Sequence, residues 1–416
     1  MSKPSPRALS RPVPLWQNRD YLLLWGGRAV SVLGTQITLI AFPLLVLALT
    51  GSPATAGLVA SARTVPYLLF ALPAGALVDR WDRKLTMIVC SAGSALTLAS
   101  IPIAYALGTL TVPQIAAVSF IEGAFGVVYG LAETSALPHV VPKSQLSAAV
   151  AQQQMQYSVG AILGPSLGGA LYTASPLLPF VLDSASYAAS SLSLTAIRTR
   201  FSSLRAVAGQ SLWGEVGEGV RWLWRQPLIR YMALLTGLTN FAGSGITLIV
   251  VVLAEQQGAS PATIGVLFAV AGAGGVLGAL LAPSVQRRLS FGRAIIGICW
   301  CFAATFFFFS VAVAPLLLMA ALAFRSLINP SYDTVQMTYR LALIPDALQG
   351  RVNSVFRLGA QGFTPLGLAT TGILLERAGG TTTALFMGLF LVAVAIVTSF
   401  NRHVRLAPRL SDLSAA

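Results

Sequence analysis

Apolar runs of about 20 residues recur along the whole chain, and they decide what it can fold into. Hydrophobic residues make up 55% of the 416 residues and charged residues only 10%. A helix of about 20 apolar residues crosses the hydrocarbon core of a bilayer, whereas the alternating pattern of membrane-barrel strands is absent from the sequence. The sequence therefore predicts an all-α, polytopic membrane protein.

The apolar runs divide the chain into twelve expected membrane spans. They lie at 21–48, 57–79, 85–108, 112–134, 147–172, 177–197, 229–253, 262–283, 293–313, 315–337, 354–375 and 381–400. The expected organisation is a cytoplasmic tail (1–20), a six-helix half (21–197), a cytoplasmic linker (198–228), a second six-helix half (229–400) and a cytoplasmic tail (401–416).

The placement of the basic residues sets the expected orientation. The net charge of +14 could indicate a nucleic-acid partner. However, most of the 27 Lys and Arg residues fall in the tails and in loops on the same side of the membrane, and Arg377 alone lies in an expected outer loop. This bias follows the positive-inside rule. We therefore expect a multi-pass protein of the bacterial cytoplasmic membrane with both termini in the cytoplasm, with the lipid bilayer as a partner and no nucleic acid.

Short stretches recur at matching places in the two halves. SPATAG at 52–57 returns as SPATIG at 260–265, a displacement of 208 residues, and GAL at 75–77 returns at 278–280, a displacement of 203. Parallel repeats of this kind occur in some transporters. We therefore expect two halves of the same orientation.

The linker contains one amphipathic segment, SLWGEVGEGVRWLWRQ at 211–226. Its apolar residues Trp213, Val216, Val220 and Leu223 share one helical face. Such a helix either lies in the membrane interface or docks against the underside of the bundle, and the sequence leaves both open.

The loop between the second and third spans is unusually charged. Residues 75–85 read GALVDRWDRKL, and this pattern resembles motif A of the major facilitator superfamily. The matching residues are Gly75, Asp79, Arg80, Arg83 and Lys84. One branch of this superfamily holds macrolide, multidrug and enterobactin exporters. The sequence resembles that branch in two places, in span 1 from residue 18 onward and at PFVLDSASYAAS in span 6. The resemblance implies a secondary transporter that works by alternating access.

The aspartate of this loop occurs in one half only, because Ala282 takes the equivalent place in the second copy. If the acid served only to keep an inner loop in water, both copies of the loop would be expected to carry it. Asp79 therefore has a further expected role. In the superfamily, this aspartate docks on the start of span 11, here near Arg351, when the cytoplasmic side is closed. Unpaired N–H groups at a helix start and a nearby arginine both favour such a contact.

Span 5 carries a regular row of glycines in GAILGPSLGG. Glycines spaced by four residues clear one helix face for a close neighbour, which is also common in ordinary membrane packing. The row resembles the antiporter motif (motif C) of the superfamily and favours export over import. Its residues are Gly160, Gly164, Pro165, Gly168 and Gly169.

Two charges lie near the middle of expected spans, at Glu122 and Arg325. They differ by 203 positions, so they occupy equivalent places in the two halves. Charges in the hydrocarbon are functional by default, although a permanent structural ion pair is the alternative. Because the resemblance places spans 4 and 10 at the central cavity, we expect the two residues to face each other, or both to face the substrate. Glu122 is the expected proton-coupling residue, while Arg63 has no evident partner.

Further polar residues fit the wall of a central substrate cavity. These candidates are Arg28, Gln36, Tyr129, Asn240, Asn329 and Tyr332. Many relatives carry an acid after the glycine of span 1, whereas Thr35 follows Gly34 here. Span 1 therefore lacks that acid for proton coupling, which favours Glu122 as the coupling residue. Asp183 in span 6 is expected to be structural.

Other function classes find little support in the sequence. His139 and His403 are the two histidines and have no metal-ligand spacing around them, and no phosphate-binding Walker loop is present. We therefore expect no enzyme, no cofactor and no metal. The expected function is proton-coupled efflux of an amphipathic, macrolide-like drug by a monomer. An exporter of an endogenous siderophore or metabolite, or a non-transporting receptor or scaffold, is the alternative.

Overall fold

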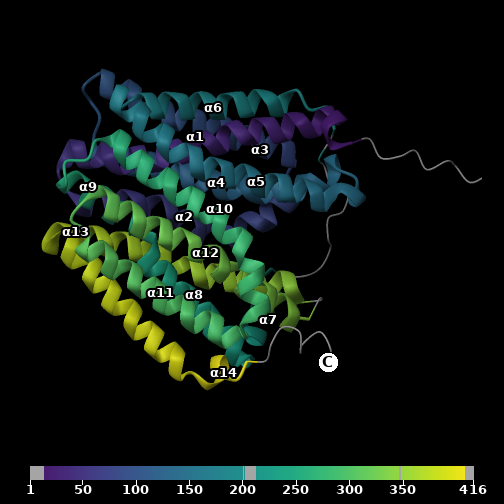
Figure 1. Ribbon diagram of the computed structural model, residues 1–416. Coiled ribbons are helices and arrows are strands. Elements are labelled where there is room, and N and C mark those ends of the chain that lie inside the picture. The colour runs from purple at the N-terminus through teal and green to yellow at the C-terminus, as the bar shows by residue number, and fades with distance from the viewer. Residues whose placement is uncertain (1–13, 200, 202–211, 346–347, 408–416) are drawn as a thin grey trace, which may run out of the picture.

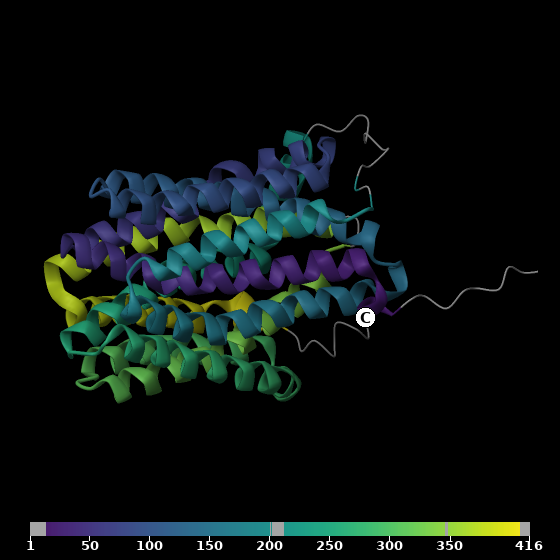
Figure 2. The ribbon, with the colours of Figure 1, turned by 90° about the horizontal axis from the view of Figure 1, so that it is seen from above.

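The computed structural model describes residues 14–199, 201, 212–345 and 348–407, and it places long helices in two sets (Figures 1 and 2). The first set comprises α1 (Arg19–Thr50), α2 (Pro53–Arg80), α3 (Arg83–Ala106), α4 (Val112–Val140), α5 (Leu146–Ala174) and α6 (Leu178–Thr195). The second set comprises α8 (Pro227–Ser244), α9 (Ile246–Gln256), α10 (Pro261–Arg288), α11 (Phe291–Val311), α12 (Pro315–Leu343) and α13 (Gln349–Phe400). Shorter elements are α7 (Leu212–Arg225), α14 (Arg402–Arg405) and 3-10 turns at Leu15–Gln17 and Lys143–Gln145. The predicted all-α membrane fold is confirmed.

Polar residues at the helix starts explain where several helices begin. Ser52 accepts a hydrogen bond from the Thr55 amide at 3.1 Å, and Ser260 accepts one from the Thr263 amide at 3.2 Å. Each serine precedes a proline at the first helical position, where the missing N–H costs no hydrogen bond. The repeated SPAT stretch is therefore a helix start that occurs once in each set.

Eight helices of the described residues are long and apolar enough to cross a membrane by length and composition. Each of the twelve expected spans falls largely within a helix, but two boundaries differ. The expected span 229–253 is divided into α8 and α9 at Gly245. The last two spans run together in α13, which is broken at Gly379, where φ is 78° and ψ is 172°. Glycine adopts this conformation without the steric cost that a side chain brings.

The two sets contact each other mainly through two helix crossings, α5 with α10 and α2 with α13, and α9 adds smaller contacts with α1 and α2. Glycines from both helices meet at each crossing. A Cβ on Gly372 of α13 would lie 2.9 Å from Cα of Gly57 in α2. A Cβ on Gly169 of α5 would lie 3.0 Å from Cα of Gly265 in α10. The backbones therefore pack directly against each other, as small residues allow in membrane helices.

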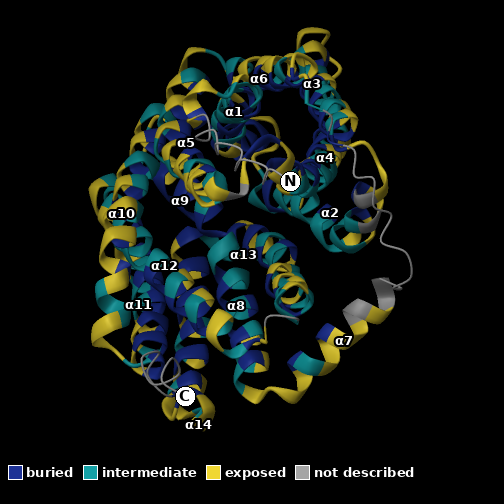
Figure 3. Cartoon of the chain, turned by 90° about the vertical axis from the view of Figure 1, so that its right-hand side faces the viewer, coloured by how far each residue is buried: buried dark blue, intermediate teal, exposed yellow. Residues whose placement is uncertain are grey.

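Helix α7 packs against the beginning of α13 (Figure 3). A Cβ on Gly219 would lie 2.9 Å from the carbonyl oxygen of Arg351, and Leu223 is buried. The contact favours docking of the amphipathic segment on the bundle. The side chains of Trp213 and Val216 lie outside the described residues.

Candidate functional site

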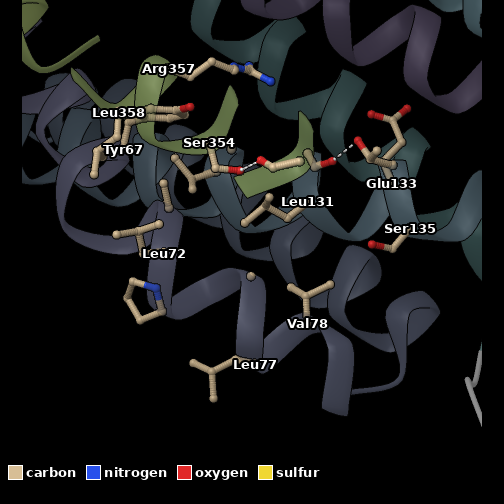
Figure 4. A pocket seen from close by; sticks show the side chains of 18 of the residues that line it. Tyr67, Leu72, Leu77, Val78, Leu131, Glu133, Ser135, Ser354, Arg357 and Leu358 are labelled. Carbon is tan, nitrogen blue, oxygen red and sulfur yellow. Dashed lines mark hydrogen bonds between the residues drawn. The ribbon is translucent and has the colours of Figure 1, made fainter. Parts of the chain in front are cut away.

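Two cavities lie between the first helix set and the start of α13. The larger has a volume of about 1160 Å³ and is seen from close by in Figure 4, where Glu133 and Arg357 lie on its wall. The smaller has a volume of about 480 Å³. Arg28, Tyr67 and Tyr157 line both. The walls come from α1, α2, α4, α5 and, at Tyr187, α6 on one side and from α13 on the other.

The smaller cavity borders a buried ion pair between α2 and α4. Arg63 Nε lies 2.6 Å from Glu122 Oε2, and an Arg63 Nη donates to Glu122 Oε1 at 2.9 Å. Tyr187 of α6 donates its hydroxyl to the same Oε1 at 3.0 Å. Both charged side chains line the cavity, although Glu122 is only 3% exposed. Arg63, for which the sequence indicated no partner, is thus the charge partner of Glu122.

A second carboxyl group lies behind this pair on α6. Asp183 is fully buried and contacts two hydroxyl groups, Thr38 Oγ1 at 2.7 Å and Ser186 Oγ at 3.2 Å. On the same face of α6, the Tyr187 hydroxyl is 2.9 Å from Thr35 Oγ1. Polar groups therefore run from the cavity wall into the interface between α1 and α6.

Arg28 occupies the boundary between the two cavities. Its Nε lies 3.3 Å from Glu133 Oε2, and it donates a hydrogen bond to the Tyr157 hydroxyl. Its guanidinium stacks over the ring of Tyr129, 4.9 Å from the centroid, a geometry that attracts a cation to an aromatic face. The expected cavity residues Arg28 and Gln36 lie on a cavity wall, and Tyr129 supports Arg28 from behind.

Arg325 contacts a different set of groups. It donates to Asn329 Oδ1 at 3.0 Å, and Asn329 donates to Asp333 Oδ2 at 3.1 Å, all on α12. The guanidinium lies 3.6 Å from the ring centroid of Phe302. Arg325 lines neither cavity, and Glu122 is paired with Arg63 instead. The expectation that Glu122 and Arg325 face each other is therefore wrong for this arrangement, because each is held by neighbours in its own helix set. The alternative, that both face the substrate, stays a prediction.

Three expected cavity residues from the second set also lie away from both cavity walls. Asn240 donates its amide to the carbonyl of Ala360 at 3.0 Å. Tyr332 is buried, and its hydroxyl accepts from Gln336 at 3.0 Å. Asn329 bridges the arginine and the aspartate described above. Their side chains are engaged within the second helix set, which is why they do not line these cavities.

The residues of motif A lie near the larger cavity, and the described side chains differ in what they contact. Gly75 lines it, and Arg80 is exposed. Arg83 contacts His139 of α4 at 2.7 Å, and Lys84 donates to the carbonyl of Ile197 at 2.6 Å. Both basic residues thus tie the loop to neighbouring helices.

The expected gate between Asp79 and Arg351 involves a side chain outside the described residues, that of Asp79. Its partner Arg351 lines the larger cavity and forms an ion pair with Glu218 of α7. The gate therefore stays a prediction.

The glycines of motif C face two neighbouring helices. A Cβ on Gly160 would lie 3.1 Å from a methyl of Val32, and one on Gly168 would lie 2.6 Å from the carbonyl of Ile37, both in α1. Gly164 faces Gln36 in the same row, and Pro165 is buried. Gly169 turns instead to α10. The row brings α5 against α1 and, through its last member, against the second set.

The sequence reasoning did not recognise Arg63 and Tyr187 as members of the site. An arginine and a glutamate within two spans were a usable signal for the first, since intramembrane charges pair with one another. Tyr187 has no such signal, because its role depends on how α6 packs. Among the described residues, no group of three His, Cys, Asp or Glu side chains is placed to hold a metal ion.

Comparison with known proteins assigns the chain to a family. The family model described as "Transmembrane secretion effector" matches residues 11–412. The "Multidrug efflux pump Tap" of Mycolicibacterium fortuitum is 26% identical over 400 residues, which cover 92% of this chain and 94% of that protein. The "Macrolide efflux protein A" of Streptococcus pyogenes is 29% identical over 163 residues, 38% of this chain and 39% of that protein.

Solved structures share the fold. A bacterial homologue of the lysosomal transporter Spinster, in an inward-facing and unoccupied conformation, has a TM-score of 0.75 at 14% identity and covers 94% of this chain and 98% of its own. The nucleoside transporter NupG has a TM-score of 0.75 at 15% identity, covering 92% of this chain and 98% of its own. The chain therefore belongs to the transmembrane secretion effector family of the major facilitator superfamily and is a multi-pass membrane transporter, not an enzyme, with relatives that are named as efflux proteins.

Proposed function

We propose that the chain is a proton-coupled antiporter that exports amphipathic drugs, macrolides among them, across the bacterial cytoplasmic membrane. The observation that carries the proposal is the Arg63–Glu122 ion pair on the wall of the smaller cavity. A carboxylate that can be reached from a cavity and is paired with an arginine can exchange that partner for a proton, which leaves the arginine as a cation that is free to turn toward the cavity or toward another acid. Export is further supported by the relatives named as efflux proteins.

The position of the cavities supports alternating access. The larger cavity is lined by residues at the ends of α2 and α4 and at the beginning of α13, such as Val78, Glu133 and Gly350. That end of the bundle carries most of the basic residues, which the positive-inside rule assigns to the cytoplasm. At the opposite end, the glycine crossings at Gly57 and Gly169 bring the helix sets together. The arrangement corresponds to an inward-open transporter closed on its outer side.

Binding of a proton and binding of the substrate compete in this scheme. When Glu122 is ionised, Arg63 holds it and the cavity presents a neutral pair. When Glu122 takes a proton, its attraction to Arg63 falls, and the guanidinium is free to move. A change in the position of Arg63 alters the wall of the smaller cavity, so the protonated and ionised forms differ in their affinity for substrate. Such a difference is what coupling requires.

The test is drug-driven proton movement in inside-out vesicles from an efflux-deficient host. We expect Glu122→Gln to abolish proton movement and pH-dependent efflux. Glu376→Gln, which changes an exposed carboxyl group just before the break of α13 at Gly379, serves as the matched control and should retain both. A Glu122→Gln protein that is correctly inserted and exports with wild-type, protonophore-sensitive rates would contradict the proposal.

Export of an endogenous siderophore or metabolite is the second candidate, and a non-transporting receptor the third. A susceptibility panel of macrolides and other amphipathic drugs separates them. Protection that a protonophore removes supports drug export. Proton movement in response to a cell extract, without protection against any drug, would favour a metabolite exporter.

A further inference from the structure

The buried cluster around Arg63 contains more negative than positive charge if every group is ionised. Arg63 carries one positive charge, while Glu122 and Asp183 carry two carboxyl groups. Among the described residues, no Lys or Arg nitrogen lies within 4.0 Å of Asp183, although Arg63 is within electrostatic range of it. An uncompensated charge in such a place is strongly unfavourable. The cluster is therefore balanced when it holds one proton.

The hydrogen bonds around Asp183 fit a carboxyl group that can donate. Thr38 Oγ1 has one proton, and it is 2.7 Å from Asp183 Oδ2 but also 3.1 Å from the carbonyl of Thr35. Ser186 Oγ is 3.2 Å from Asp183 Oδ1 and 2.7 Å from the carbonyl of residue 183. Hydroxyls within helices commonly donate to such backbone carbonyls. If both do so, Asp183 must supply the proton of its bond to Thr38.

The packing also brings Asp183 close to α1. The Cα of Asp183 would lie 3.1 Å from a Cβ on Gly34, and its carboxyl group would lie closer still. A side chain at position 34 would therefore displace the carboxyl group from Thr38. Asp183 lies in the packed interior and lines neither cavity, whereas Glu122 lines the smaller cavity.

We propose that Asp183 is a second proton-binding site, and that one proton and Arg63 exchange places between Asp183 and Glu122. This inference rests on the proposed proton coupling. The structure contains the Arg63–Glu122 pair, and in this arrangement the proton is assigned to Asp183. In the other arrangement, Arg63 pairs with ionised Asp183 and the proton is on Glu122. Both arrangements have zero net charge, so the exchange moves a proton between an occluded position and the cavity wall.

Tyr187 lies between the two carboxyl groups in this scheme. It is one helical turn beyond Asp183 on α6, and its hydroxyl donates to Glu122. The groups that bond to Asp183 or lie within electrostatic range of it are Thr38 on α1, Arg63 on α2, Glu122 on α4, and Ser186 and Tyr187 on α6. Arg63 and Glu122 are the charged side chains among them, so the charge count involves one arginine and two carboxyl groups.

The experiment counts protonated carboxyl groups by infrared spectroscopy of the purified full chain at neutral pH. The carbonyl band of a protonated carboxylic acid is compared between the wild type and each variant. We expect Asp183→Asn to lose one carboxylic acid band. Glu122→Gln should lose the same band, because Asp183 then ionises to balance Arg63. Arg63→Gln should gain one, because two carboxyl groups are left without a cation.

Several outcomes overturn the proposal. An unchanged band in Glu122→Gln would mean that Asp183 keeps its proton permanently and is structural. An unchanged band in Asp183→Asn would mean that the proton is not on this residue. Each variant is first checked for an unaltered elution volume and helix content, and Glu376→Gln should leave the band unchanged. If the band pattern is as expected but vesicles move no protons, the proposed function fails while the charge balance of the cluster stands.

Discussion

The two helix sets repeat the same local patterns but use charge differently. At equivalent positions 203 residues apart, the first set has Glu122 and the second has Arg325. Glu122 pairs with an arginine on another helix, whereas Arg325 bonds to Asn329 and, through it, to Asp333 on its own helix, and it meets another helix at the uncharged ring of Phe302. An ion pair between helices changes when the helices move, and hydrogen bonds along one helix move with that helix. The buried ion pair between helices thus lies in the first set, and the second set provides one cavity wall through α13.

The largest expected effect comes from breaking the pair between helices. Arg63→Leu leaves Glu122 without its cation, and removal of one partner of a buried pair costs about 3–5 kcal/mol. Asn329→Leu in the second set removes a contact along one helix and should cost only about 1 kcal/mol. Thermal unfolding in detergent measures both. The loss of stability in Arg63→Leu should become smaller as the pH falls, because protonation of Glu122 removes the uncompensated charge. It should also be smaller in the double variant Arg63→Leu/Glu122→Leu, which removes both charges. Equal losses in the two single variants would contradict the comparison.

The second prediction concerns the two crossings, where the helix sets are alike. Gly169→Val and Gly372→Val each push a side chain into a facing backbone, and overpacking of this kind costs about 1–3 kcal/mol. The two losses should be similar. Gly297→Ala in α11 is the matched control, because no heavy atom lies within 4 Å of its added Cβ. It should be neutral or slightly stabilising, since alanine favours a helix. A large loss at one crossing only would show that the crossings are not equivalent.

The sequence predicted the elements that depend on composition and on local signals. The apolar runs, the serine and proline helix starts and the glycine row of α5 all appear as helices or close helix contacts. The break at Gly245 did not follow from the same reasoning, because this glycine lies in an apolar segment that reads as one continuous span, whereas Gly379 falls between the two last expected spans. The site was harder to predict. Glu122 was found because a charge in the hydrocarbon is conspicuous, whereas its pairing with Arg63 depends on how α2 packs on α4. Asp183 was interpreted as structural because α6 was expected at the periphery, and its contacts with α1 depend on the space left by Gly34.

The third prediction tests the difference between the two copies of the loop after the GAL stretch. Asp79→Asn should slow transport without changing which compounds are recognised, because it weakens the expected contact with the start of α13 and leaves the cavity walls intact. Loss of a charge near a helix start weakens the contact by about 1 kcal/mol, which lowers the equilibrium constant for closing the gate roughly fivefold. Initial efflux rates of several drugs measure the effect. The matched variant Ala282→Asp places the acid in the other copy and should not restore the rate of Asp79→Asn. A changed drug profile at unchanged turnover would refute the gate.

The smallest expected effect lies at the outer end, where the α2–α13 crossing differs from the α5–α10 crossing by one acid. Glu376 of α13 accepts hydrogen bonds from the Ser52 hydroxyl and, at 3.1 Å, from the Ala54 amide at the start of α2. The equivalent position in α5 is Thr173, which bonds to its own helix through the carbonyl of Gly169. A carboxylate at a helix start is favourable but is weakened by solvent where it is exposed. Glu376→Gln should therefore open the outer side slightly more often, measured as faster labelling of a cysteine introduced at the half-buried Ala54, where the change adds one sulfur atom and spares the crossing glycines. Thr173→Val should leave that labelling rate unchanged, because its hydroxyl joins no two helices. If the two variants label equally, the glycine contacts alone hold the outer side closed, and the added acid makes no difference between the crossings.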